Sequence, residues 1–245
     1  MKLTRRLFTV VVVSAFFCEL ALLGPLVQAQ DPTFVGWNLT ASLSASATFA
    51  VLSNSLLQVT LVNTYPGDTP DQSHVLTALF FSGADGLTPV SVTAGAGSVQ
   101  WVGGTSSAPP GPSVLGEEWE YATGPGNPGG ASDGIASAGL DNNFGHGNFA
   151  SPGDALDGSS YGILSTGYAG SQGDGIDGRL FIQNTIVFVL SNFTGNVGSI
   201  SNVSFQYGTG LSEPNVPGVL VPEPSSVTLV VAGMLFLALL GRRRH

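Results

Sequence analysis

The chain has 245 residues, of which only 9% are charged, and its formal net charge is −9 at pH 7. Seven Lys and Arg residues stand against sixteen Asp and Glu residues, and an acidic surface of this kind repels nucleic acid and anionic lipid. We therefore expect no nucleic-acid partner. The length allows one large or two small domains.

Residues 1–29 have the pattern of a signal peptide. A basic start (Lys2, Arg5 and Arg6) precedes an apolar stretch, and small residues around Ala29 occupy the positions that a signal peptidase reads. We expect cleavage after Ala29. The adjacent arginines leave two export routes open, the general secretory route and the twin-arginine route.

The single cysteine, Cys18, lies inside this segment, so the exported chain would contain none. A secreted domain without cysteine has no disulfide bonds and depends on core burial or bound ions for its stability. Thiol catalysis and thiolate metal sites are excluded for the same reason.

Short β-strands are the predicted elements of the next part of the chain. Leu57, Val59 and Leu61 alternate with polar residues, which is the period of two expected of a strand with one buried face. A turn cluster follows at 64–71. Stretches of similar character, the last of them a weak edge-strand pattern, are 46–54, 75–83, 89–93, 98–102 and 114–121.

Between residues 103 and 178 the sequence is dominated by Gly, Pro, Ser, Asn and Asp. A loop this long inside a compact domain is either functional or disordered. Strand patterns return at 179–193 and 199–208. Many short β segments, turn residues between them and no amphipathic helix predict an all-β fold: a single β-sandwich of jelly-roll type over residues 30–215, with the loop-rich region 103–178 inserted in it.

The sequence contains no serine-hydrolase elbow, phosphate-binding loop or zinc-protease motif. His74 and His146 are the only histidines between Ala29 and Val221. We interpret His74 as the residue before a strand and His146 as an accessible loop residue, and a general base needs an orienting partner that the sequence does not supply. We therefore expect a protein that is not an enzyme.

Two glycine-bracketed loops each place two aspartates three residues apart, Asp154 with Asp157 and Asp174 with Asp177. Short oxygen-bearing side chains on a loop suit a hard cation such as calcium. Asp-Gly pairs also form ordinary turns, in which glycine takes a positive φ. Both interpretations stay open, and calcium is the one cofactor that the sequence suggests.

Aromatic residues on the loops, such as Trp119, Tyr161 and Tyr168, are candidates for exposure. If exposed, they would stack on sugar rings and make the domain a carbohydrate-binding or glycan-hydrolysing jelly roll. Large aromatic side chains are mostly buried, so we expect core or edge packing. The carbohydrate-directed module is the alternative to a non-enzymatic surface protein.

The last 25 residues, "VPEPSSVTLVVAGMLFLALLGRRRH", contain three parts in order. Val221-Pro222-Glu223-Pro224 precedes an apolar run at 226–241, and the basic cluster Arg242-Arg243-Arg244 follows it. As a helix the run would be about 24 Å long, which is short for a bilayer core of roughly 30 Å. We expect a transmembrane segment with the arginines on the cytoplasmic side.

This ordered set resembles the PEP-CTERM sorting signal of bacterial surface proteins that an exosortase processes. We assign the sorting signal to residues 216–245, a small part of the chain. The resemblance implies an exported protein of a polysaccharide-producing Gram-negative bacterium. Its implied partners are the exosortase, the inner membrane during transit, and exopolysaccharide. Its implied destination is the cell surface or the extracellular matrix. The resemblance assigns no activity to the domain upstream.

Overall fold

The computed structural model describes residues 31–222 except Asn54, Asp85 and Pro125, and these residues form one compact unit, Asp31–Pro222. Several sequence-based assignments lie outside the described residues: the signal peptide with Ala29, the motif residues Glu223 and Pro224, the transmembrane segment 226–241 and the cluster Arg242-Arg243-Arg244. Within the described part of the chain, no helix is long and apolar enough to cross a membrane.

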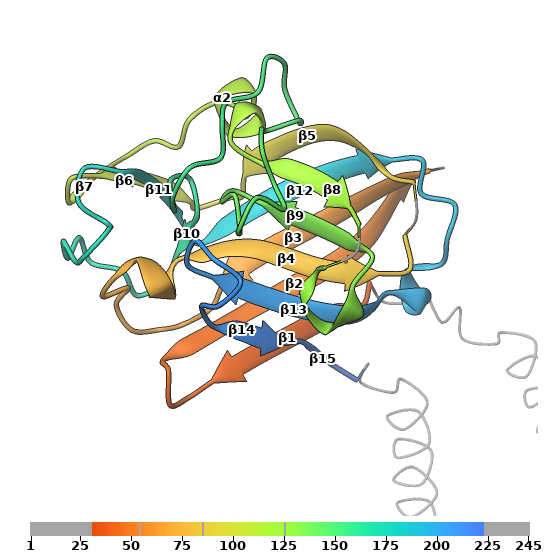
Figure 1. Cartoon of the computed structure of the whole chain (residues 1–245), viewed down its shortest axis with the longest axis horizontal. Helices are drawn as coiled ribbons and strands as arrows, with labels where there is room; N and C mark the ends of the chain where they lie inside the picture. Colours follow the sequence, from red (N-terminus) through yellow and green to blue (C-terminus); the bar gives the residue numbers. More distant parts are fainter. Residues whose placement is uncertain (1–30, 54, 85, 125, 223–245) are drawn as a thin grey trace, which may run out of the picture. The chain divides into compact units, whose positions relative to one another are not determined.

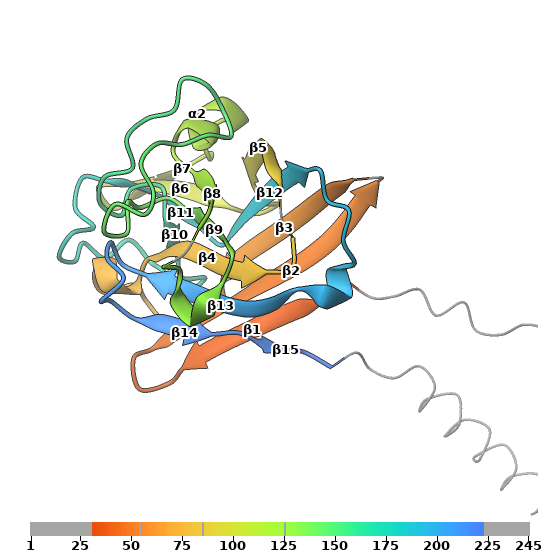
Figure 2. The same cartoon turned by 45° about the vertical axis from the view of Figure 1, so that its right-hand side comes forward.

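The fold consists of two β-sheets that pack face to face (Figures 1 and 2). The first sheet has six antiparallel strands in the order β15-β1-β2-β3-β12-β5. Their bounds are Thr33–Asn38 (β1), Leu43–Ser53 (β2), Leu56–Asn63 (β3), Thr88–Ala94 (β5), Thr185–Ser191 (β12) and Val219–Leu220 (β15).

The second sheet has nine strands, with the main order β14-β13-β4-β10-β11-β6-β7, and β9 pairs with both β4 and β8. Its strands are antiparallel except at the β10–β11 pair. Their bounds are Leu76–Ser82 (β4), Val99–Val102 (β6), Thr105–Ser107 (β7), Glu120–Thr123 (β8), Asp133–Ala136 (β9), Ile163–Leu164 (β10), Leu180–Gln183 (β11), Ser201–Tyr207 (β13) and Asn215–Pro217 (β14). The helical elements are Pro112–Glu117 (α2), Gln72–His74 (η1), Pro128–Gly130 (η2) and Val197–Ser199 (η3).

The prediction of an all-β fold is confirmed, because strands dominate and the one described α-helix has six residues. In β3 the predicted alternation holds: Leu57, Val59 and Leu61 are buried, and the residues between them are partly exposed. The core lies between the sheets, where the rings of Phe49 on β2 and Phe81 on β4 are 5.3 Å apart. Burial of such side chains is the main stabilising contribution to a sandwich of this kind.

Two sequence-based elements differ from the structure. The stretch 179–193 is divided into β11 and β12, which belong to different sheets, and Asn184 with a φ of 84° makes the bend between them. The stretch 114–121 is an edge strand only at its end: α2 occupies its first half, and Glu120 and Tyr121 begin β8, which pairs with β9 alone. Gly111 and Pro112 begin α2 at the positions that suit them, the N-cap and the first helical residue.

The region 103–178 contains regular structure as well as loops, since β7 to β10, α2 and η2 all lie within it. Its elements, mostly green in Figures 1 and 2, gather on the side of the sandwich away from β1 and β15. At the C-terminal end of the folded unit, β14 begins at residue 215, the expected domain boundary, and β15 lies beyond it. The folded unit therefore continues to Pro222.

Candidate functional site

The four aspartates proposed as calcium ligands lie in two turn-rich loops. Asp157, Asp174 and Asp177 each precede a glycine in the left-handed region, with φ values of 72°, 74° and 71° for the three glycines. These are the conformations of Asp-Gly turns. Among the described residues, no group of three or more His, Cys, Asp or Glu side chains is arranged to hold a metal ion. A calcium site on these loops stays a prediction that the geometry does not support.

Asp154 and Asp157 do influence a neighbouring carboxyl group at the end of α2. Burial, and then the negative charges of Asp154, Asp157 and Glu117, raise the pKa of Glu118 from 4.5 to about 7. A raised carboxyl pKa is one mark of a catalytic acid, but such an acid also needs a reacting partner. The charged groups that act on Glu118 are all carboxylates. Like charges beside a half-buried carboxyl raise its pKa in structural clusters as well as in active sites, so the shift alone assigns no activity to this cluster.

His74 has a carboxylate partner that the sequence did not reveal. Its Nδ1 lies 2.9 Å from Asp71 Oδ1, and the hydroxyl of Ser73 lies 3.3 Å from the same ring nitrogen. In a serine-hydrolase relay, the carboxylate and the serine contact opposite nitrogens of the imidazole. Here both contact one nitrogen, so the arrangement caps η1 and does not activate a nucleophile.

The second histidine, His146, is exposed, as expected for a loop residue between glycines. Its backbone N–H donates to Glu120 Oε2 at 3.1 Å, and it forms an isolated bridge with Ala155. These are interactions of the backbone, and they hold the loop at His146 against β8 and Ala155.

The aromatic residues of the loop-rich region pack inside the protein. Trp119 is fully buried, with its ring 4.9 Å from that of Phe188. Tyr168 is buried edge-on against Trp101, and its hydroxyl donates to the Ser171 carbonyl. Tyr161 is half-buried against the main core. The expected core packing is confirmed for Trp119 and Tyr168, and the loop-rich region offers no row of exposed aromatics from these residues.

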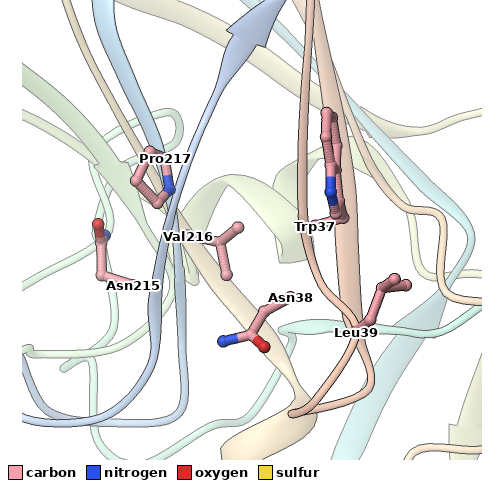
Figure 3. Close-up of a pocket in the computed structure, with 6 residues that line it drawn as sticks. All are labelled: Trp37, Asn38, Leu39, Asn215, Val216 and Pro217. Carbon is pink, nitrogen blue, oxygen red and sulfur yellow. The ribbon is translucent and has the colours of Figure 1, made fainter.

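A different tryptophan is exposed, and it lines a hollow at the open edge of the sandwich (Figure 3). Trp37, at the end of β1, is 55% exposed. The hollow has a volume of about 350 Å³, at the lower end of the range for small-molecule sites. Its walls come from both sheets, and the lining residues are Trp37, Asn38, Leu39, Asn215, Val216 and Pro217.

Gly36 explains how strands of two sheets meet at this hollow. A Cβ at this position would lie 2.7 Å from the ring of Phe205 and 3.0 Å from the Pro217 carbonyl oxygen. Only glycine allows β1 to approach β14 and the Phe205 side chain so closely. The chain then passes from β14 in the second sheet to β15 in the first, and the hollow opens between β14 and the end of β1.

Two amide groups in the hollow are partly engaged by the protein. Asn38 Oδ1 accepts the Ala41 N–H at 3.1 Å, which fixes the turn after β1. Asn215 Nδ2 donates to Ser204 Oγ and to Gln206 Oε1, both at 3.2 Å. Within the described part of the chain, Asn38 Nδ2 and Asn215 Oδ1 make no hydrogen bond, so one amide donor and one amide acceptor stay available to a ligand.

Sequence reasoning missed this hollow because β1 was not among the predicted strands. A signal was present: Phe34 and Gly36 face the core, so Trp37, one residue further, falls on the solvent side of the same strand. The partner residues 215–217 lie far along the chain, and the sequence gives no sign that they meet Trp37.

No protein-family model, no curated protein and no solved structure matches this chain. The resemblance of its C-terminal segment to the PEP-CTERM signal therefore depends on the residues of that segment alone.

Proposed function

We propose that the chain is a non-enzymatic exported protein of the bacterial cell surface or extracellular polysaccharide matrix, sorted through a C-terminal PEP-CTERM signal that an exosortase processes. The observation that carries the proposal is the ordered C-terminal set: Val221-Pro222-Glu223-Pro224, the apolar run 226–241 and Arg242-Arg243-Arg244. The inner membrane is the intermediate location. Residues 31–222 are the exported cargo, a β-sandwich of jelly-roll-like type.

The two ends of the β-sandwich lie side by side, which supports this proposal. The Val221 N–H donates to the Thr33 carbonyl at 2.8 Å, and β15 pairs with β1. The chain therefore enters and leaves the folded unit at neighbouring points. Before the signal peptide is cleaved, a domain built in this way can fold outside the membrane while the segments on both sides of it are inserted.

The folded unit also ends within the motif, at Pro222. Val219 and Leu220 are held in β15, and among the described residues Val221 is the last with a backbone hydrogen bond to the sheet. Pro222 and Pro224 each lack an N–H donor and restrict the residue before them, which opposes helix formation across the motif. An extended peptide between a folded domain and a membrane is accessible to an integral peptidase, and we infer that cleavage occurs there.

The test is the intact mass and location of the chain in its native host. We expect a mature chain that ends near Pro222 to Ser226, lacks Met234 and the three arginines, and is found outside the inner membrane. Replacing Pro222-Glu223-Pro224 by alanines should leave the arginines attached and the protein in the inner membrane. Replacing Pro109 and Pro110 by alanine is the control, because these prolines lie in the loop-rich region, and it should change neither mass nor location.

Two results would contradict the proposal. One is a native mature chain that still ends in His245, which would make the C-terminal segment an ordinary anchor. The other is a motif variant that is indistinguishable from the wild type in size and in location.

A further inference from the structure

We propose that the hollow beside Trp37 binds a sugar unit of a neutral polysaccharide. This inference concerns the folded domain and does not depend on how the C-terminal segment is processed. It replaces the sequence-based alternative, in which the loop-rich region would carry sugar-binding aromatics.

Trp37 is the first part of the argument. It is 55% exposed, whereas Trp119 is fully buried and Trp101 packs edge-on against Tyr168. Figure 3 shows the indole standing at one side of the hollow, with Val216 and Pro217 on the other. A large exposed indole presents a flat apolar face, and the C–H face of a sugar ring is a matching surface.

The free amide groups are the second part. Asn38 Nδ2 can donate a hydrogen bond and Asn215 Oδ1 can accept one, and Figure 3 shows the Asn38 amide nitrogen pointing toward β14. Sugar hydroxyls both donate and accept. A ligand that has an apolar face for an indole and hydroxyls at its rim for two amides is a sugar ring. A purely apolar ligand would leave both amides without partners in the complex.

The charges of the domain favour a neutral sugar over an acidic one. None of the six lining residues is ionisable. Arg179 is the only Lys or Arg between Ala29 and Val221, and its guanidinium lies near Ser160 in the loop-rich region. An acidic polysaccharide would therefore meet a net negative domain with no cation at the site to pair with its carboxylates.

The outward face of the first sheet offers a surface on which further sugar units of the polysaccharide could lie. Trp37 is on the outward side of β1, opposite Ser44 on β2. Behind it, two cross-strand rows of hydroxyl-bearing and β-branched residues run over this face, Val35-Ser46-Val62-Thr185 and Thr33-Thr48-Thr60-Val187-Thr93. These rows carry no charge, so a polysaccharide lying on them displaces no strongly hydrated ion.

The test is affinity gel electrophoresis of the chain purified from its host in a detergent without sugar groups. The neutral probes are hydroxyethyl cellulose, dextran and galactomannan, and the acidic probe is alginate. We expect at least one neutral polysaccharide to retard the protein and alginate to have no effect. The same neutral probe should change the tryptophan fluorescence of the wild type, because Trp37 is exposed at the site. It should leave the fluorescence of the remaining tryptophans in Trp37→Ala unchanged.

Three variants and a control assign the binding to the hollow. Trp37→Ala should lower the affinity by about tenfold or more, and Trp37→Phe should restore part of it. Asn38→Asp keeps the oxygen that accepts the Ala41 N–H but removes the free donor, so it should weaken binding without altering the turn. Val90→Ala, at a residue 48% exposed on the opposite edge strand β5, should bind as the wild type does.

Four outcomes would overturn the proposal: no retardation by any of the three neutral polysaccharides, retardation by alginate alone, equal retardation of Trp37→Ala and the wild type, or a change from dimer to monomer in Trp37→Ala measured by light scattering. The last would show that the exposed indole serves self-association. Thermal unfolding of each variant verifies that it is folded. None of these readouts depends on where the mature chain ends, so failure here is distinguishable from failure of the sorting proposal.

Discussion

The six-stranded sheet and the loop-rich region 103–178 both have a buried interior, but the contacts that fill it differ. In the sheet, alternate side chains of long strands face the core, as in β2 and β3. In the loop-rich region, backbone segments touch one another directly. A Cβ on Gly147 would lie 1.9 Å from the Glu117 carbonyl oxygen, and one on Gly153 would lie 1.7 Å from the Gly147 carbonyl oxygen.

Polar groups complete the interior of the loop-rich region. Asp133 on β9 is fully buried, and it accepts hydrogen bonds from the Tyr121 hydroxyl at 2.5 Å and the Ser132 hydroxyl at 2.6 Å. Hydrogen bonds of this kind compensate for burying a polar side chain. A segment rich in Gly, Ser, Asn and Asp is thus ordered by backbone contacts and side-chain hydrogen bonds in addition to its own buried apolar side chains, such as Leu140, Phe144 and Leu156.

The largest expected effect is at Phe188, where the two regions meet. Its ring on β12 lies 4.9 Å from Trp119 and 5.5 Å from Phe149, which both belong to the loop-rich region. Phe188→Ala should lower the free energy of unfolding by about 4 kcal/mol, because it removes a fully buried ring and leaves a cavity. Urea denaturation measures this.

The control for Phe188 is Val187→Ala, at the adjacent and partly exposed residue on the outward face of the same strand. It should cost about 1 kcal/mol or less. One cooperative transition in the wild type would mean that both regions unfold together. Two transitions, with only one of them shifted by Phe188→Ala, would contradict the coupling through this ring.

The next effect tests the backbone packing of the loop-rich region. Gly147→Ala should cost about 3 kcal/mol, because the new methyl group overlaps a carbonyl oxygen and the loop must move. Gly145→Ala is the matched control two residues away, since a Cβ there meets nothing within 4 Å. It should change the free energy of unfolding by about 0.5 kcal/mol or less. Equal effects of the two variants would refute packing through glycine.

The same contrast explains what could be predicted from the sequence. Alternation in β3 and the apolar run of β4 are local properties of the chain, so the strands and the all-β class were readable. The bend at Asn184 was not, because β11 and β12 form one uninterrupted strand-like pattern and only the positive φ separates them into two sheets. In the loop-rich region, close glycine contacts join distant residues and leave no periodic pattern.

The candidate site follows the same rule. Loop aromatics and paired aspartates were visible as residue types, and the burial of Trp119 and the turn conformation after Asp157 were both among the sequence-based expectations. The hollow beside Trp37 combines the end of β1 with β14, which are far apart in the sequence. The composition indicates which residue types could bind a ligand. Which of these residues lie close together depends on the register of the two sheets.

A smaller effect concerns Glu118, whose pKa is raised to about 7 by burial and by neighbouring carboxylates. The folded state therefore holds this proton more tightly than the unfolded state. The favourable contribution of protonated Glu118 to the free energy of unfolding is fully present below pH 4.5 and is lost as the pH rises through 7. Because the group is half-exposed and screened, Glu118→Gln should stabilise the protein by about 1 kcal/mol at pH 8.

The pH dependence of that gain is the decisive measurement for Glu118. Urea denaturation at pH 4 and pH 8 should show a difference between Glu118→Gln and the wild type at pH 8 that is nearly absent at pH 4. Asp174→Asn, an exposed carboxylate on another loop, is the charge-matched control and should show a smaller change between the two pH values. A gain of equal size at both pH values would point to better packing of the amide and not to relief of repulsion.

The smallest expected effect is that of added calcium on the melting temperature. It tests whether a bound ion stabilises the loop-rich region in addition to its glycine contacts and hydrogen bonds. A site with a dissociation constant one hundredth of the free calcium concentration would stabilise the fold by about 2.7 kcal/mol, which corresponds to a melting temperature several degrees higher. The turns at Asp157, Asp174 and Asp177 are already closed by glycines with positive φ. We therefore expect thermal scans with calcium and with chelator to agree within about 1 °C.

A larger shift in melting temperature would contradict this expectation. If the shift is abolished in Asp154→Asn/Asp157→Asn but kept in Asp174→Asn/Asp177→Asn, the cation lies at the first loop, and the reverse pattern would assign it to the second. Either shift would mean that this region is held by an ion as well as by its backbone.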